Sequence, residues 1–186
     1  MTVIAAGART GIGRFMGTLK SHSATDLGGI AIAGALQNAG ISGHDVDYVI
    51  MGHVLQAGAG QNSARQAALK GGIPMSVPSI TINKLCLSGI NAIALAAQMI
   101  NAGEADIVVA GGMESMSNAP HLMIGSREGI KYGDWTMKDS LAFDGLFCAI
   151  DNLGMGESTE KFTAEKGMSR QSQDEFSAMS HAKAAA

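Results

Sequence analysis

The sequence predicts an α/β fold built around a parallel β-sheet. The chain has 186 residues, of which 46% are hydrophobic, enough to form a substantial core. Residues 77–112 have the pattern of a strand, a turn, an apolar helix and a second strand, which is one βαβ unit. The second of these strands is a continuous apolar run, typical of a strand covered on both faces. The length suits one domain, or one domain with part of another.

Four elements are expected before this unit. Strands are predicted at residues 2–6 and 46–55, and helices at 25–39 and 61–70, where apolar residues recur at helical spacing. Gly40 follows the first helix, and a glycine pair follows the second. Glycine at these positions commonly ends a helix.

Within the βαβ unit, the strands are predicted at residues 77–83 and 105–112 and the helix at 90–103. The helix sequence is apolar on almost every side. A helix of this kind must be covered on several faces, so we expect it inside a layered architecture.

The character of the sequence changes after Gly112. Residues 113–156 are rich in Met, Gly, Ser and Asp and show little periodicity, which predicts a long excursion outside the sheet. Helices are expected again at 157–166 and 170–186. Ser169 can cap the last one, and Ser172 with Glu175 offers a capping-box alternative. The sequence stops without a helix terminator, which suggests a chain cut within an element.

Composition argues against several classes of function. The net charge is −3 and no cluster of Lys and Arg offers a surface for phosphates, so nucleic acid is not expected as a partner. No apolar stretch is long enough to span a bilayer, and the first residues lack the basic region of a signal peptide. The two cysteines indicate neither a disulfide framework nor a metal motif, which favours a reducing, cytoplasmic setting.

A glycine-rich stretch at Gly7–Gly13 has the spacing of a dinucleotide-binding turn, as in NAD(P)-dependent short-chain dehydrogenases. The residues after it do not read as an amphipathic helix. Neither Tyr48 nor Tyr132 has a lysine four residues later, so the Tyr-x-x-x-Lys pair of those dehydrogenases is missing. A surface turn is therefore the favoured interpretation.

Cys86 is the candidate nucleophile. It lies where the strand at 77–83 gives way to the apolar helix, near unpaired N–H groups at the positive end of a helix dipole. These groups favour the thiolate and can stabilise an oxyanion, as acyl transfer requires. The alternative is a cysteine used as a small apolar filler, and Cys148 is read as such a structural thiol.

None of the five histidines is an evident base for this cysteine. His22 and His44 fall in polar connectors, His181 lies in the last predicted helix, and His53 is interpreted as a half-buried residue with its hydrogen bonds satisfied. His121, in the irregular region, is the one retained as a candidate.

Three motifs carry a resemblance to a known family. Ala8-Arg9-Thr10, the Asn-x-x-Cys-x-Ser-Gly stretch at 83–89 and Gly-Gly-Met-Glu-Ser-Met-Ser at 111–117 resemble the thiolase family in order and spacing. The stretch from Gly60 to Ala67 is similar to the helix between them. The resemblance extends over essentially the whole chain.

The resemblance implies two similar α/β halves stacked in five αβαβα layers, with a loop domain inserted in the first half. Residues 1–115 would then be the core of the N-terminal half, and 116–186 a truncated loop domain. The family acts on acetyl-CoA and acyl-CoA in fatty acid metabolism, assembles as a homotetramer, and uses no metal or redox cofactor. The cysteine matching Cys86 takes the acyl group.

This sequence departs from the family pattern in two ways. The family's second half, with its activating histidine and a second acid/base cysteine, lies outside this sequence. A His-Met-Gly motif of many acetoacetyl-CoA thiolases appears as Gly154-Met155-Gly156, so Met155 alone carries over as a substrate-binding residue. Acyl-chain length and reaction direction stay open. A catalytically silent binding or assembly module is an alternative, and a ketosynthase-type condensing enzyme is another.

Overall fold

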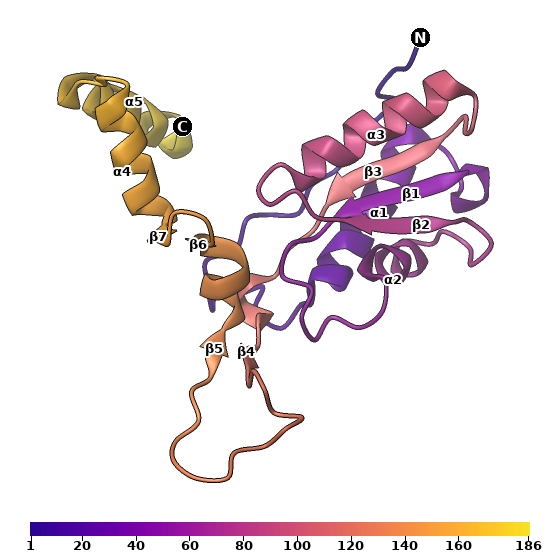
Figure 1. Ribbon diagram of the computed structural model, residues 1–186. Helices are drawn as coiled ribbons and strands as arrows, with labels where there is room; N and C mark the ends of the chain where they lie inside the picture. Colours follow the sequence, from indigo (N-terminus) through magenta and orange to yellow (C-terminus); the bar gives the residue numbers. More distant parts are fainter. The chain divides into compact units, whose positions relative to one another are not determined.

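A parallel sheet of three strands organises the first part of the chain. Its strands are β1 (Tyr48–Gly52), β2 (Ser79–Ile82) and β3 (Val108–Gly112), in the order β2-β1-β3. Helix α3 (Ser88–Ala102) connects β2 to β3, and this connection passes β1 in the middle of the sheet. The predicted βαβ unit and parallel sheet are confirmed (Figure 1).

The computed structural model describes residues 1–186, which form two compact units, Met1–Gly145 and Leu146–Ala186. The first also contains α1 (Ala24–Ala39), η1 (Gly43–Asp45), α2 (Ser63–Lys70), η2 (Met116–Asn118), β4 (His121–Leu122) and β5 (Lys138–Asp139). The second contains β6 (Phe147–Cys148), β7 (Leu153–Gly154), α4 (Met155–Glu165) and α5 (Arg170–Ala185). A π-helical turn, η3, spans Leu141–Leu146.

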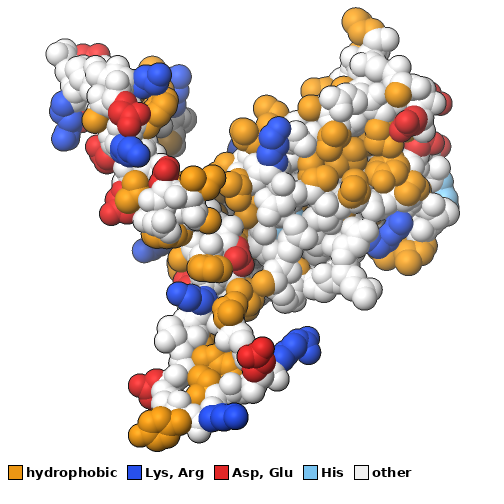
Figure 2. All heavy atoms as spheres, viewed as in Figure 1, with side chains coloured by type: hydrophobic (Ala, Val, Ile, Leu, Met, Phe, Trp, Pro, Cys, Tyr) orange, Lys and Arg blue, Asp and Glu red, His pale blue; other side chains and the backbone are white.

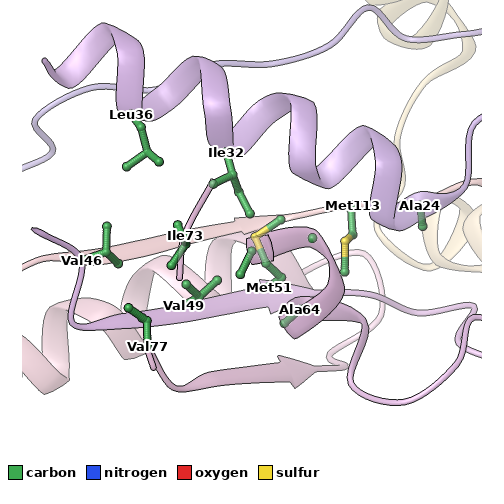
Figure 3. Close-up of a cluster of buried hydrophobic side chains, with 12 residues drawn as sticks. Ala24, Ile32, Leu36, Val46, Val49, Met51, Ala64, Ile73, Val77 and Met113 are labelled. Atoms are coloured by element: carbon green, nitrogen blue, oxygen red, sulfur yellow. The ribbon is translucent and has the colours of Figure 1, made fainter. Parts of the chain in front are cut away.

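The central strand β1 supplies the core with side chains on both of its faces. Val49 and Met51 point to one side, where they pack with α1 and α2 in the larger cluster (Figure 3). Ile50 points to the other side and packs with Ala92 and Ala96 of α3. This alternation follows from the two-residue period of a strand. Because both faces are covered, β1 reads in sequence as the unbroken apolar run of a buried parallel strand.

Helices α1 and α2 cover the same face of the sheet and have defined ends. The Ser23 side chain accepts from the Asp26 amide, and Asp26 accepts from the Ser23 amide, which forms a capping box at the start of α1. Gly40 ends α1 in the left-handed conformation, as predicted. Asp26 also accepts a 2.6 Å hydrogen bond from the Lys70 ammonium group, so an ion pair ties α1 to the end of α2.

Helix α3 covers the opposite face, but only one of its own faces is covered. Ser88, Ala92 and Ala96 are buried, while Ile90 is 67% exposed and Ile93 42% exposed. Figure 2 shows hydrophobic side chains gathered over the part of the first unit where α3 lies in Figure 1. The expectation that this helix is covered on several sides is therefore not met within residues 1–186.

The expectation that no stretch could span a bilayer was also wrong by length and composition. Residues Leu85–Ala102 have a mean hydropathy of 1.5 over 18 residues, which meets the criterion for a membrane-crossing helix. The fold accounts for this apolar character without a membrane. Helix α3 is the crossover helix of a βαβ unit and packs against the sheet through its alanine face.

The strand predicted at residues 2–6 is absent. An extended segment becomes a strand only when a neighbouring strand exchanges hydrogen bonds with it, and β1, β2 and β3 pair only among themselves. Val3 is 69% exposed and Ile4 79% exposed. The segment is held instead by polar contacts, from Thr2 to Asn101 and from the Asn38 amide to the Gly7 carbonyl.

The irregular stretch after Gly112 stays outside the sheet, as predicted. Its β4 and β5 form one small antiparallel pair, and β6 and β7 form another. Residues up to Gly145 belong to the first compact unit. The division into a core at 1–115 and a loop domain at 116–186 stays a prediction. The last two predicted helices are confirmed as α4 and α5, and Ser169 caps α5 by accepting from the Ser172 amide.

The Asp26→Asn substitution tests the junction of α1 and α2. The Lys70 ammonium group and the Ser23 hydrogen bonds hold the pKa of Asp26 well below its usual range. A carboxyl group of this kind stabilises the fold above its unfolded pKa of about 4, and that contribution is lost as the pH falls toward the folded value. Because the side chain is 39% exposed, we expect a loss of only about 1 kcal/mol at pH 7.

Thermal denaturation at several pH values checks this. The difference between wild type and Asp26→Asn should be largest at pH 7 and shrink progressively below pH 4. Asp134→Asn, at an exposed carboxylate that forms no ion pair, controls for the removal of one charge. A difference that persists unchanged at low pH would contradict the electrostatic account.

Candidate functional site

The turn between β2 and α3 presents Cys86 to solvent. Cys86 is a free, exposed cysteine two residues before the first residue of α3. Leu87 is the helix cap, and no side chain caps the first turn of the helix. The Ser88 amide donates to the Leu85 carbonyl at 2.9 Å, whereas the amides of Gly89 and Ile90 in that turn have no backbone partner and can donate to an oxygen atom of a bound group. The predicted position of Cys86 at a helix start is confirmed.

The conformation of this turn is unusual. Leu85 has φ +50°, in the left-handed region that a leucine rarely adopts. The Asn83 side-chain oxygen accepts a 2.9 Å hydrogen bond from the Leu85 amide. The buried Ser88 hydroxyl donates to the Leu85 carbonyl at 2.6 Å and accepts from the Lys84 amide at 2.8 Å. Polar groups on both sides of Leu85 therefore fix the backbone that carries Cys86.

Glycines allow the start of α3 to lie directly against the ends of two strands. A Cβ atom at Gly52, the last residue of β1, would lie 2.6 Å from the Ser88 Cβ and 2.8 Å from the Gly89 nitrogen. A Cβ atom at Gly112, the last residue of β3, would lie 3.3 Å from the Gly89 Cα. A side chain at Gly52 is incompatible with this approach, and one at Gly112 would require a small shift of α3. It places the turn with Cys86 at the carboxyl end of the sheet.

A buried polar cluster joins the same strand ends. His53, which directly follows β1, is only 2% exposed. Its Nδ1 lies 2.9 Å from the Ser63 hydroxyl at the start of α2, and its Nε2 lies 3.3 Å from a Glu114 carboxylate oxygen. The Ser63 hydroxyl lies 3.3 Å from the hydroxyl of Thr81 on β2. The interpretation of His53 as a satisfied residue is correct, although it is fully rather than half buried.

Glu114 also holds the chain that follows β1. Its two carboxylate oxygens accept hydrogen bonds from the amides of Val54 and Leu55, at 3.0 and 3.3 Å. Both nitrogens of His53 are engaged in the cluster. The cluster is therefore a structural brace at the carboxyl end of the sheet, and His53 is not free to accept a proton from Cys86.

The rest of the Gly-Gly-Met-Glu-Ser-Met-Ser stretch anchors the segment before α1. Ser115 donates to the His22 carbonyl at 2.8 Å, and the Ser117 hydroxyl accepts from the Met16 amide at 2.9 Å. The adjacent Asn118 donates to the carbonyls of Lys20 and His22, each at 3.0 Å. The motif is thus explained by hydrogen bonds that fasten residues 16–22 to the region after β3.

The other candidates occupy different positions. Met155 is the first residue of α4 and belongs to the second unit, with its side chain 40% exposed. Cys148 is half-buried in that unit, and its sulfur accepts from the Asp151 amide at 3.4 Å. His121 is an exposed residue of β4. Neither His121 nor Cys86 makes a side-chain hydrogen bond, so the structure gives the cysteine no base.

The glycine-rich stretch Gly7–Gly13 opens no helix. It is followed by turns up to Ser23, and α1 starts only at Ala24. The helix N-terminus that a dinucleotide pyrophosphate requires is missing from this position. The surface position of the stretch is confirmed, but no strand precedes it and it has no regular turn, since the first turn begins at Phe15. No group of three His, Cys, Asp or Glu side chains is arranged to hold a metal ion.

Sequence reasoning missed the supporting residues of the site. Gly52, Ser88 and Glu114 were recognisable only as parts of motifs or of a strand. Their functions depend on contacts between segments far apart in sequence, such as the bond from Glu114 back to Val54. A weak signal existed for Gly52, because a glycine within a strand often marks a close approach of another backbone.

Comparison with known proteins identifies the relatives of this chain. The family model of the thiolase N-terminal domain matches residues 2–186. A probable acetyl-CoA acetyltransferase of Mycobacterium leprae is 58% identical over 185 residues, which is 100% of this chain and 47% of the relative. An acetyl-CoA acetyltransferase of Cupriavidus necator is 49% identical over 99% of this chain and 47% of the relative.

A third relative gives the same result. A cytosolic acetyl-CoA acetyltransferase of Gibberella zeae is 48% identical over 98% of this chain and 46% of the relative. The chain therefore spans about half the length of the curated relatives that it matches.

The Gly52→Ala substitution tests the packing of α3 against β1. The new methyl group would meet the Ser88 and Gly89 backbone at less than 3 Å, so the helix must shift. Overpacking of this kind costs about 1–3 kcal/mol of stability. Urea denaturation should show this loss, whereas Gly111→Ala, whose methyl group would meet only Met51 at 3.7 Å, should be nearly neutral. Equal stability of the two variants would contradict the packing account.

Timed labelling with iodoacetamide at neutral pH compares the two thiols. Cys86 is exposed at a helix start, and Cys148 is half-buried with its sulfur in a hydrogen bond. We expect peptide mapping to find Cys86 modified before Cys148. Faster modification of Cys148 would show that the wrong cysteine has been assigned as nucleophile.

Proposed function

This chain belongs to the thiolase family, and we propose that it carries the nucleophile of an acyl-CoA:acetyl-CoA C-acyltransferase. The reaction makes or cleaves acetoacetyl-CoA or another 3-ketoacyl-CoA. The observation that carries the proposal is the exposed thiol of Cys86 at the start of α3, in a turn whose sequence matches the family motif. The names of the relatives as acetyl-CoA acetyltransferases support the same reaction class.

The proposed first step transfers the acyl group to Cys86. The Cys86 sulfur attacks the thioester carbonyl of acyl-CoA, the bond between that carbonyl and the CoA sulfur breaks, and CoA leaves as the thiol with the proton from Cys86. The negative charge on the carbonyl oxygen during the attack is stabilised by N–H groups at the start of α3. The product is an acyl-cysteine.

In the proposed second step, acetyl-CoA loses a proton from its methyl group and the resulting carbon attacks the acyl-cysteine carbonyl. A carbon–carbon bond forms, the carbon–sulfur bond to Cys86 breaks, and the released thiolate takes up a proton equivalent to the one that the acid/base group removed from the methyl group, which regenerates the thiol. Cleavage runs through the same steps in reverse. The chemistry needs a base for the Cys86 proton and an acid/base group for the acetyl-CoA methyl group.

We place both of these groups in the part of the protein that corresponds to the other half of the relatives. Three observations support this placement. The chain spans about half the length of the relatives, Cys86 makes no hydrogen bond to a base, and the outer face of α3 is apolar and exposed. A companion half would cover this face, either in the same chain or in another. A homotetramer is the proposed assembly.

Met155 is proposed to contact the acyl substrate. It lies at the exposed start of α4, where Glu157 accepts from the Gly154 amide and orders the first turn. Gly154 stands where many acetoacetyl-CoA thiolases have histidine, so the proposal covers acetoacetyl-CoA and other 3-ketoacyl-CoA substrates alike. We propose a cytoplasmic enzyme without metal or redox cofactor, whose CoA thioesters are substrates.

Thiolysis of acetoacetyl-CoA by added CoA tests this function. We expect residues 1–186 alone to show no measurable turnover, because a missing general base lowers the rate by about 10²–10⁴-fold and groups that act as a unit are lost together. Activity should appear when the companion half is supplied in the same chain or as a second chain. The assay follows the loss of the magnesium–enolate absorbance of acetoacetyl-CoA.

Two cysteine variants of the active assembly complete the test. Cys86→Ser should abolish thiolysis, and Cys148→Ser should retain it. Full activity of Cys86→Ser would refute the proposed nucleophile. Robust turnover by residues 1–186 alone would show that these residues contain a base, with His121 the first to replace. An assembly that binds CoA thioesters without turnover would favour a silent binding module.

A further inference from the structure

We propose that Ser88 is a positioning residue for Cys86, and that its hydroxyl group locks the nucleophile turn in its left-handed conformation. This inference rests on the proposed function only in naming Cys86 as the nucleophile. Ser88 itself is buried and 4% exposed, so it acts through the backbone of residues 84–86 rather than on a substrate.

The turn needs such a lock because its geometry is intrinsically unfavourable. Leu85 has φ +50°, where the Cβ atom of an L-residue crowds its own backbone. Its side chain is 55% exposed and gains little from packing. Without other contacts, Leu85 would leave this region, and the direction in which the next residue, Cys86, points would change with it.

The Ser88 hydroxyl uses both its donor and its acceptor capacity in hydrogen bonds to this turn. The hydroxyl donates to the carbonyl of Leu85 at 2.6 Å and accepts from the amide of Lys84 at 2.8 Å. These backbone groups lie on the two sides of the Leu85 Cα, so the bonds oppose rotation about it. A serine hydroxyl has one donor and can accept as well, which matches the two partners.

The lock is anchored to the sheet. Ser88 is the first residue of α3, and it packs against Gly52 at the end of β1. The contact is so close that a Cβ atom added to Gly52 would lie only 2.6 Å from the Ser88 Cβ. Ser88 therefore cannot follow the turn if the turn moves. The position of β1 therefore fixes Ser88, Ser88 fixes Leu85, and Leu85 determines the direction of Cys86 at the start of α3.

The test compares alkylation of Cys86 by iodoacetamide in variants of the full chain. Ser88→Ala should slow the reaction about three- to tenfold, because the thiol loses its fixed position at the helix start. Ser79→Ala is the matched control, since the Ser79 hydroxyl is buried in the same unit without a hydrogen-bond partner. It should leave the rate unchanged. Circular dichroism confirms that each variant is folded.

A suppressor variant separates positioning from a general structural effect. Asparagine adopts the left-handed region more readily than leucine does, and the Leu85 side chain is exposed. Adding Leu85→Asn to Ser88→Ala should therefore restore much of the alkylation rate, while Leu85→Asn alone should match wild type. If Ser88→Ala reacts like wild type, or if Leu85→Asn gives no rescue, the proposal is overturned.

Failure of the proposed function has a different signature. Acetyl-CoA replaces iodoacetamide in a parallel series on the assembly with the companion half. Wild-type Cys86 that takes no acetyl group while the alkylation pattern holds would refute the acyltransferase and leave the positioning role intact. Normal acetylation of Cys86 with no effect of Ser88→Ala on either reaction would refute the positioning role and leave the acyltransferase intact.

Discussion

The close approach of α3 to the ends of β1 and β3 is the constraint on which the site depends. Gly52 lacks the side chain that would keep the helix away from the end of β1, and Gly112 allows a similarly close contact at the end of β3. The helix can then begin directly at the carboxyl edge of the sheet. A methyl group at Gly52 would displace the first turn of α3, and with it the turn that carries Cys86. The position of Cys86 relative to the sheet therefore depends on the absence of a side chain at Gly52.

The surrounding residues make this edge rigid. His53, Ser63, Thr81 and Glu114 form a buried cluster that links the ends of all three strands and the start of α2. Ligands of open α/β sheets usually bind at the carboxyl ends of the strands, where loops meet. Here the edge holds an exposed thiol beside a rigid frame of strand ends, which suits a nucleophile that must meet a carbonyl carbon in a fixed direction.

The sequence predicted what periodicity and local chemistry determine. The βαβ unit, the glycine at the end of α1 and the position of Cys86 at a helix start were all predicted correctly. The predictions of a strand at residues 2–6 and of a fully covered α3 were wrong. Both features depend on which neighbouring segments are present rather than on the segment itself. The bonds of Glu114 and Ser88 could not be predicted either, since a motif does not reveal which distant or left-handed backbone its side chains contact.

The central claim is that this frame presents Cys86 as the acyl acceptor. The most direct measurement incubates the assembly of this chain and its companion half with isotopically labelled acetyl-CoA, quenches the reaction in acid and maps the labelled peptide by mass spectrometry. The account predicts one acetyl group, on the peptide that contains Cys86, and its release when CoA is added. Label on the Cys148 peptide, or no covalent label while thiolysis proceeds, would contradict it.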